Sequence, residues 1–289
     1  MARAVAGELA ARPEPRLPGG PGAIARVPRA LFYAAIWLLG GVLVAFIVLP
    51  LVRLTLATSP AGIVDAGTHA DIRNAILLSL KDAAITAVLA AVLGVPLAYV
   101  LARHAFPGRG FVQAIVDLPL AVPHTVVGIA LLFVFSRRGW VGAPAEQVGI
   151  SFFGSSWGIV AGMLFVSAPF MVGSVRVAIE AIDPRIEQAA RSLGASPAYA
   201  FRRITLPLAA RGIMTGLVLA YARSISEFGA IVVLAYYPMT APVKVYDLYL
   251  QSGLNASAGA AVLLLIVTLS TFVVFRALAS GQVRPLSLR

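Results

Sequence analysis

The sequence contains no cysteine and only two lysines, Lys81 and Lys244, among its 289 residues. Without cysteine the chain can form neither a disulfide nor a thiolate metal site, and we assign it no metal or cofactor. A GxxxxGK phosphate loop needs a glycine before its lysine, whereas Leu80 and Val243 precede these two. We therefore expect no nucleotide site of that type and do not expect the chain to be an enzyme.

Charged residues are also scarce, at 12% of the chain, whereas hydrophobic residues make up 60%. A soluble domain carries about a quarter charged residues. Here the apolar residues are collected into runs long enough to cross the roughly 30 Å hydrocarbon core of a bilayer. The composition predicts an all-α, multi-pass protein of the cytoplasmic (inner) membrane. Basic loops beside membrane spans then explain the net charge of +11 better than nucleic-acid binding does.

Six apolar runs are long enough to be membrane-spanning helices. In chain order they are Leu31–Val52, Ala83–Leu101, Phe111–Phe135, Trp157–Val175, Ile213–Ala235 and Ala258–Phe275. Residues 1–29 precede them and are rich in Ala, Pro, Gly and Arg without an apolar period, which predicts a disordered basic tail. We expect residues 30–289 to form one transmembrane domain.

Six spans place both chain ends on the same side of the membrane, and basic residues indicate which side that is. If the N-terminus is cytosolic, the cytosolic segments hold 16 of the 23 lysines and arginines. Acidic residues divide evenly, five on each side, so arginine carries the asymmetry. The sequence therefore predicts that the N- and C-termini both lie in the cytosol.

The longest cytosolic segment, residues 178–211, contains EQAARSLGASPAYAFRRITLP at positions 187–207. Apolar residues recur at the spacing of one helix face in each half, at Ile186, Ala189, Ala190 and Leu193, then at Pro197, Ala200, Phe201 and Ile204. Gly194 favours the end of the first helix, and Ser196 with Pro197 favours the start of a second. Glu187 and Arg191 have the spacing of an ion pair on the opposite face. We predict two short helices hinged at Gly194, which need another surface to pack against.

This segment resembles the EAA loop of ABC-importer permeases, in which the loop docks in a groove of the cytosolic ATPase subunit. The resemblance rests on Gly194 followed by Ile204, Leu206 and Pro207, with two alanines upstream. It implies a coupling loop that includes Glu187, Gln188, Ala189, Ala190, Gly194, Phe201, Ile204, Leu206 and Pro207. Gln188 stands where the family usually has glutamate, and Glu187 adjoins it.

A second stretch, YARSISEFGAIVVLAYYPMTAPVKVYDLYLQSGL at residues 221–254, resembles the permeases for molybdate and tungstate. The stretches GVPLAYVLARHAFPGRG and DLPLAVPHTVVGIALLF fit the same group, and the resemblance runs from about residue 74 to residue 279. It implies the membrane subunit of an ATP-binding-cassette importer for a tetrahedral oxyanion. A cytosolic ATPase and an extracytoplasmic binding protein are the implied partners. Sulfate permeases share much of the pattern, so a sulfate/thiosulfate-type permease is an alternative.

One coupling loop per chain and two ATPase subunits per importer imply that this chain forms a homodimer in the lipid bilayer. The less favoured alternative is a secondary transporter driven by an ion gradient. Such a transporter would need an internal repeat and an ion site at the membrane midplane. We find no convincing repeat between the two halves of the sequence.

Polar and ionisable side chains inside predicted spans are candidates for the substrate pathway or its gate. They are Asp117, His124, Arg223, Ser224, Ser226 and Glu227. Arg223 and Glu227 could instead be a structural i,i+4 pair. Likewise, DLPLAVPH at residues 117–124 fits a proline-kinked span as well as a broken helix that lines a pathway.

Overall fold

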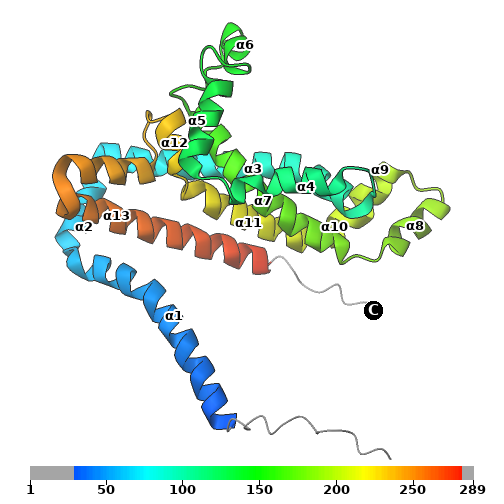
Figure 1. The fold of residues 1–289 in the computed structure, drawn as a ribbon, viewed down its shortest axis with the longest axis horizontal. Helices are drawn as coiled ribbons and strands as arrows, with labels where there is room; N and C mark the ends of the chain where they lie inside the picture. The colour runs from blue at the N-terminus through cyan, green and yellow to red at the C-terminus, as the bar shows by residue number, and fades with distance from the viewer. Residues whose placement is uncertain (1–28, 282–289) are drawn as a thin grey trace, which may run out of the picture. The chain divides into compact units, whose positions relative to one another are not determined.

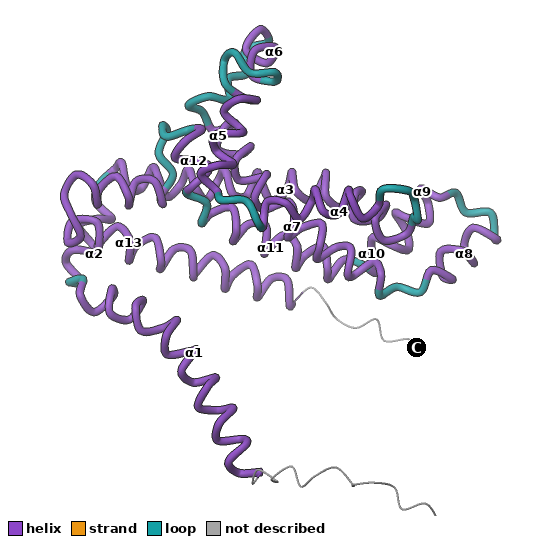
Figure 2. The backbone as a smooth tube through the Cα atoms, viewed as in Figure 1, coloured by secondary structure: helices purple, strands orange, loops and turns teal. Residues whose placement is uncertain are grey.

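The computed structural model describes residues 29–281, and in that range every regular element is a helix (Figures 1 and 2). This confirms the all-α class. The predicted disordered tail lies outside the described residues except for Arg29, which begins α1. Backbone contacts divide the chain into two units, residues 1–53 and 54–289, and each is described by itself.

The helices up to the middle of the chain are α1 (Arg29–Ala57), α2 (Pro60–Thr68), α3 (Ala70–Arg103), α4 (Arg109–Asp117), the 3-10 turn η1 (Leu118–Leu120), α5 (His124–Phe135), α6 (Gly142–Gln147) and α7 (Ser156–Glu180). The remainder are α8 (Pro184–Ser192), α9 (Pro197–Ala200), the π turn η2 (Phe201–Thr205), α10 (Leu206–Leu208), α11 (Ala210–Ile225), α12 (Gly229–Leu234) and α13 (Ala241–Gly281).

Among the described residues, four helices are long and apolar enough to cross a membrane, namely α1, α3, α7 and α13. Two bent pairs bring the number of spans to as many as six. The α4–η1 segment meets α5 at 113°, and Pro197–Leu208 meets α11 at 69°. If each bent pair counts as one span, the described residues offer six candidate spans in all, two of which are not continuous helices.

The third predicted span, Phe111–Phe135, is broken between η1 and α5. Pro119 lies in η1, and Pro123 has the extended backbone angles φ −57° and ψ 131°. Proline lacks the N–H that would continue a helix, so the break falls at these residues. The sequence fitted either a kinked span or a broken helix, and the 113° angle between the two helical parts favours the broken helix.

The fifth predicted span, Ile213–Ala235, was wrong as a single helix because α11 ends at Ile225 and α12 begins at Gly229. No proline marks this break. Instead, the Glu227 carboxylate accepts the Ala230 N–H at 2.8 Å and so satisfies a free donor in the first turn of α12. The start of α12 is thus determined by the buried Glu227 side chain, which lies inside an apolar run.

The second and sixth spans begin earlier than predicted, at Ala70 and Ala241. Their polar first turns pair with each other, since Lys244 Nζ lies 2.6 Å from Asp71 Oδ2 and the Ala241 N–H donates to Ser79 Oγ at 2.8 Å. Apolar runs alone could not reveal these turns. Helix α13 also bends at Gly253, whose φ of 79° suits glycine.

The segment between α12 and α13 is tied to the first half of α13. The Tyr236 hydroxyl donates to Asp247 Oδ1 at 2.8 Å, and Gln251 donates to the second carboxylate oxygen at 2.9 Å. The hydrogen bond to this carboxylate raises the pKa of Tyr236 to about 12. Tyr236 therefore keeps its proton, and its donor role, at neutral pH.

The core of the second unit lies between α3, α7 and α11, which run side by side in Figure 1. Ala98, Leu101, Met171, Val175 and Ala220 are buried there. Small residues in this set let the helix backbones approach closely, as in other membrane helix bundles. The segment that contains α8, α9 and α10 lies at one end of the bundle, and α5 and α6 project from its side (Figure 1).

Candidate functional site

The α7–α11 loop (residues 181–209) contains the two short helices that the sequence predicted, hinged at Gly194. This residue has φ +93°, in the left-handed region that favours glycine. The Ala195 N–H donates to the Ala190 carbonyl and the Gly194 N–H to the Arg191 carbonyl, both at 3.0 Å, which is the Schellman ending of a helix. Ser196 Oγ then accepts the Tyr199 N–H at 3.2 Å and caps α9. The hinge is therefore built from local hydrogen bonds.

In the second half of the α7–α11 loop, the apolar stripe from Ala200 onward packs against the protein. The Phe201 ring lies 4.7 Å from the Tyr99 ring, centroid to centroid, in an edge-to-face arrangement. Phe201 and Leu206 pack against the core between α3, α7 and α11, and Ile204 is half-buried. Most of the second apolar stripe therefore packs within this chain and is not available to a partner protein.

The first half of the loop exposes two residues of its apolar stripe, as a docking surface requires, but it buries the acidic residue that was expected on the opposite, polar face. Ile186 is 46% exposed and Leu193 is 90% exposed, whereas Glu187 is 8% exposed. Glu187 Oε1 accepts a hydrogen bond from Arg103 Nε at 2.9 Å, and its Oε2 accepts one from the Tyr99 hydroxyl at 3.1 Å. The predicted exposed pair of Glu187 with Arg191 is therefore wrong.

An open groove of about 510 Å³ lies at the hinge of the loop. It is lined by Gln188, Arg191, Ser192, Ala195 and Pro197. Leu193 adjoins the groove in the chain and is 90% exposed. The loop thus presents an apolar side chain beside a polar groove.

A polar cluster lies between the start of α5 and the break that separates α11 from α12. It consists of His124, Arg223, Ser226 and Glu227. Arg223 Nη2 donates to Glu227 Oε2 at 2.7 Å and lies 2.9 Å from His124 Nδ1, which is itself 3.1 Å from the same carboxylate oxygen. His124 is the first residue of α5, and Glu227 sits in the break between α11 and α12. Residues 99 positions apart in the chain therefore form one ionic group.

The charges of the polar cluster are unequally exposed. The Glu227 side chain is 2% exposed, while those of Arg223 and His124 are 22% and 40% exposed. The close approach depends on Gly229, because a Cβ there would lie 2.7 Å from the His124 Cβ. The buried carboxylate holds the two nitrogen-bearing side chains, which offer donors toward the more open side.

The other predicted pathway residues lie apart from this group or at its edge. Ser226 Oγ donates to the Arg223 carbonyl at 3.1 Å. Ser224 is fully buried, and Asp117 is exposed at the end of α4, where it caps no helix. The structure thus joins four of the six predicted residues and leaves out Ser224 and Asp117. Nothing in the sequence pattern paired His124 with Arg223, because that contact is long-range.

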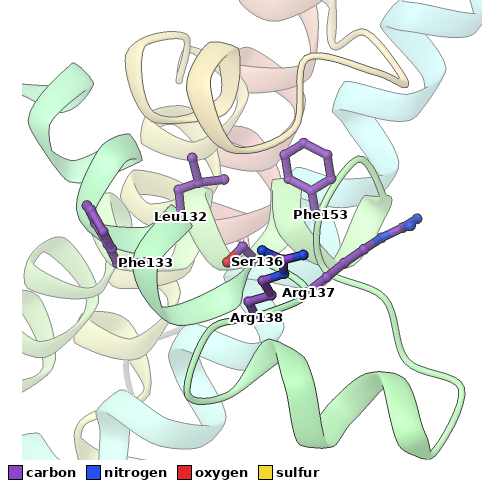
Figure 3. A pocket seen from close by; sticks show the side chains of 6 residues that line it. All are labelled: Leu132, Phe133, Ser136, Arg137, Arg138 and Phe153. Carbon is purple, nitrogen blue, oxygen red and sulfur yellow. The ribbon is translucent and has the colours of Figure 1, made fainter.

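A separate apolar cavity of about 530 Å³ opens at the C-terminal end of α5, far along that helix from His124. Figure 3 shows the side chains that line it, which are Leu132, Phe133, Ser136, Arg137, Arg138 and Phe153. Arg137 Nε lies 3.2 Å from Glu146 Oε1, and the two side chains are 71% and 34% exposed. The cavity therefore does not belong to the polar cluster.

Helices that break around a buried ion pair, within a protein of several candidate membrane spans, are typical of transport proteins. The family model described as "Binding-protein-dependent transport system inner membrane component" matches residues 92–282. The chain belongs to this family of transport permeases and is a multi-pass protein of the inner membrane.

Two relatives illustrate the similarity within the family. The chain is 43% identical over 240 residues to "Molybdate/tungstate transport system permease protein WtpB" of Thermococcus kodakarensis, covering 82% of this chain and 92% of the relative. It is 36% identical over 202 residues to "Probable sulfate transport system permease protein cysT" of Nephroselmis olivacea, covering 68% of this chain and 71% of the relative.

The fold is also that of a solved bacterial ABC transporter involved in the import of the acidic polysaccharide alginate. The TM-score is 0.72 at 20% identity, and the match covers 88% of this chain and 96% of the other. A second structure of a bacterial alginate ABC transporter is in complex with an alginate pentasaccharide-bound periplasmic protein, with a TM-score of 0.70 at 21% identity and coverage of 88% and 94%.

Proposed function

We propose that this chain is the membrane-spanning subunit of an ATP-binding-cassette importer for a tetrahedral oxyanion, molybdate or tungstate. The observation that carries the proposal is the 43% identity to a molybdate/tungstate permease over 82% of this chain. The match to a sulfate permease is lower, at 36% identity over 68% of the chain, and supports sulfate as the second candidate.

The polar cluster suits the passage of a doubly charged oxyanion. Arg223 and His124 supply N–H donors on the more exposed side of the cluster, whereas the buried Glu227 carboxylate offsets the arginine charge. A pathway must attract the ion without holding it in a deep well, because tight binding would slow its release. A partly neutralised arginine between two broken helices meets both requirements.

The α7–α11 loop is the proposed docking surface for a cytosolic ATPase subunit. Leu193 and the adjoining groove are free to contact a partner, and the ATPase would supply the phosphoryl-transfer chemistry. Because each chain carries one such loop, a homodimer would engage two ATPase subunits symmetrically. An extracytoplasmic binding protein would deliver the oxyanion at the opposite side, and the family's dependence on binding proteins supports this.

Uptake by reconstituted vesicles tests the proposal. Vesicles that contain this chain with its ATPase and binding protein should accumulate molybdate and tungstate when ATP is present, even after ionophores have collapsed all ion gradients. Excess sulfate should compete weakly. Uptake that stops with the gradients while ATP remains would identify a secondary transporter instead, and preferential uptake of sulfate would favour the second candidate.

The orientation with both termini in the cytosol remains a prediction that thiol labelling can check. The chain has no native cysteine, so a single introduced thiol reports one position. Ser252 and Ser196 are both exposed, near the bend of α13 and at the hinge of the α7–α11 loop. Ser252→Cys should react with a membrane-impermeant maleimide in intact cells, and Ser196→Cys should react only after permeabilisation. The reverse pattern would invert the topology.

A further inference from the structure

We infer that Tyr99, Arg103 and Glu187 form a clamp through which the α7–α11 loop moves α3 during the transport cycle. The inference rests on the proposed function, because it assigns the clamp to the coupling between ATP hydrolysis and transport. Chain connectivity alone makes α7 and α11 follow this loop. Helix α3 does not adjoin the loop in the chain, so it follows the loop through non-covalent contacts, namely its packing against α7 and α11 and the direct link made by the clamp.

Arg103, in the last turn of α3, bridges two points of the loop. Its Nε donates to Glu187 Oε1 and its Nη2 donates to the Ile182 carbonyl, both at 2.9 Å. Ile182 precedes α8, and Glu187 lies in the first turn of α8. A guanidinium that bonds two acceptors in fixed directions gives geometric specificity as well as attraction. The start of α8 is therefore held in one position relative to the end of α3.

Tyr99 lies one turn earlier on the same face of α3 and contacts both halves of the loop. Its hydroxyl donates to Glu187 Oε2 at 3.1 Å, while its ring packs edge-to-face on Phe201 beyond the hinge. Gly194 lets the two short helices pivot, but the clamp ties both of them to α3. Movement at the hinge must therefore either displace α3 or break these contacts.

Burial distinguishes the clamp from an ordinary surface ion pair. The side chains of Arg103 and Glu187 are 10% and 11% exposed, whereas those of Arg109 and Glu180, which also join two helices, are 38% and 40% exposed. Exposed pairs are screened by water and contribute little. A buried pair with its hydrogen bonds satisfied resists separation, because parting the charges leaves each of them desolvated and unpaired.

The contacts at the N-terminal end of α3 indicate which helix such a movement would reach. Ser79 Oγ accepts the Ala241 N–H, and Asp71 pairs with Lys244, so the first half of α3 is joined to the start of α13. Helix α3 is one continuous element from Ala70 to Arg103. It can therefore carry a displacement from the loop to the opposite end of the bundle.

The test replaces both charged members, in the double variant Arg103→Met with Glu187→Leu, so that no buried charge is left unpaired. We expect the variant to insert and to retain the ATPase subunit. Molybdate taken up per ATP hydrolysed should fall about tenfold, in the range of ordinary coupling between sites. The matched control, Arg109→Met with Glu180→Leu, should keep the wild-type ratio. A wild-type ratio in the clamp variant, or loss of the ATPase subunit from it, would overturn the inference.

A second experiment measures the movement of α3 directly and does not depend on the identity of the substrate. Spin labels on Leu77→Cys in α3 and Leu219→Cys in α11, both exposed positions, should show an ATP-dependent distance change that the clamp variant loses. If wild-type vesicles take up no oxyanion, the proposed function is wrong. The spin-label distances would still test whether the clamp moves α3. If the clamp variant does not fold, Tyr99→Phe should weaken the same distance change, and an unchanged response there would count against the clamp.

Discussion

Replacing both Arg223 and Glu227 by glutamine is expected to leave the protein folded while lowering oxyanion uptake by about tenfold or more. Hydrogen bonds to charged groups contribute about 1.5–3 kcal/mol, so loss of the arginine donors should cost at least that factor. Glutamine at 227 can still accept the Ala230 N–H, which the Glu227 carboxylate now accepts at 2.8 Å. The start of α12 is thereby preserved while both charges are removed.

The single variants should behave differently from the double variant. Arg223→Leu leaves Glu227, which is 1% exposed, with only the histidine beside it, and loss of one partner of a buried pair costs about 3–5 kcal/mol. Exchanging the two residues would not be informative, because arginine at 227 has no acceptor for the Ala230 N–H. Thermal unfolding in detergent and vesicle uptake separate the two effects.

An exposed ion pair provides the control for this experiment. Arg137→Gln with Glu146→Gln removes a pair whose side chains are 71% and 34% exposed, and both stability and uptake should stay near wild type. If the double glutamine variant at 223 and 227 also transports normally, the polar cluster is a structural pair and not part of the pathway.

Leu193→Asp is expected to remove the ATPase subunit from the purified complex while membrane insertion remains normal. Leu193 is 90% exposed beside the groove at the hinge, so its burial would come from a partner. Central apolar anchors of an interface contribute about 2 kcal/mol or more, which corresponds to roughly 30-fold in affinity. Copurification of the tagged chain with its ATPase, followed by titration, measures this loss.

Gly194→Val should weaken the same interface by a different route. The φ of +93° at this position is strained for a residue with a Cβ, at a cost of about 1–2 kcal/mol, and relief of the strain would open the Schellman ending of α8. Phe201→Ala is the contrast, because Phe201 packs on Tyr99 and should affect stability more than docking. Normal ATPase recovery with both Leu193→Asp and Gly194→Val would contradict the docking proposal.

Several properties of the protein were determined by the sequence alone because they depend on local patterns. Apolar runs of the right length predicted an all-α membrane protein, and the described residues contain four continuous candidate spans and two bent helix pairs. Gly194, Ser196 and Pro197 predicted the hinge, since a helix cap needs only neighbouring residues. The prolines near residue 120 likewise marked the break before α5.

Only the tertiary structure decided which polar groups meet and which apolar residues stay exposed. Arg103 and Glu187 are 84 positions apart, and His124 and Arg223 are 99 apart, so no local spacing could pair them. The periodicity of α8 placed Glu187 on its polar face, yet its carboxylate is buried against Arg103 of another helix. The break before α12 has the same origin. A buried carboxylate satisfied a free N–H there, because desolvated polar groups in a membrane must find partners within the fold.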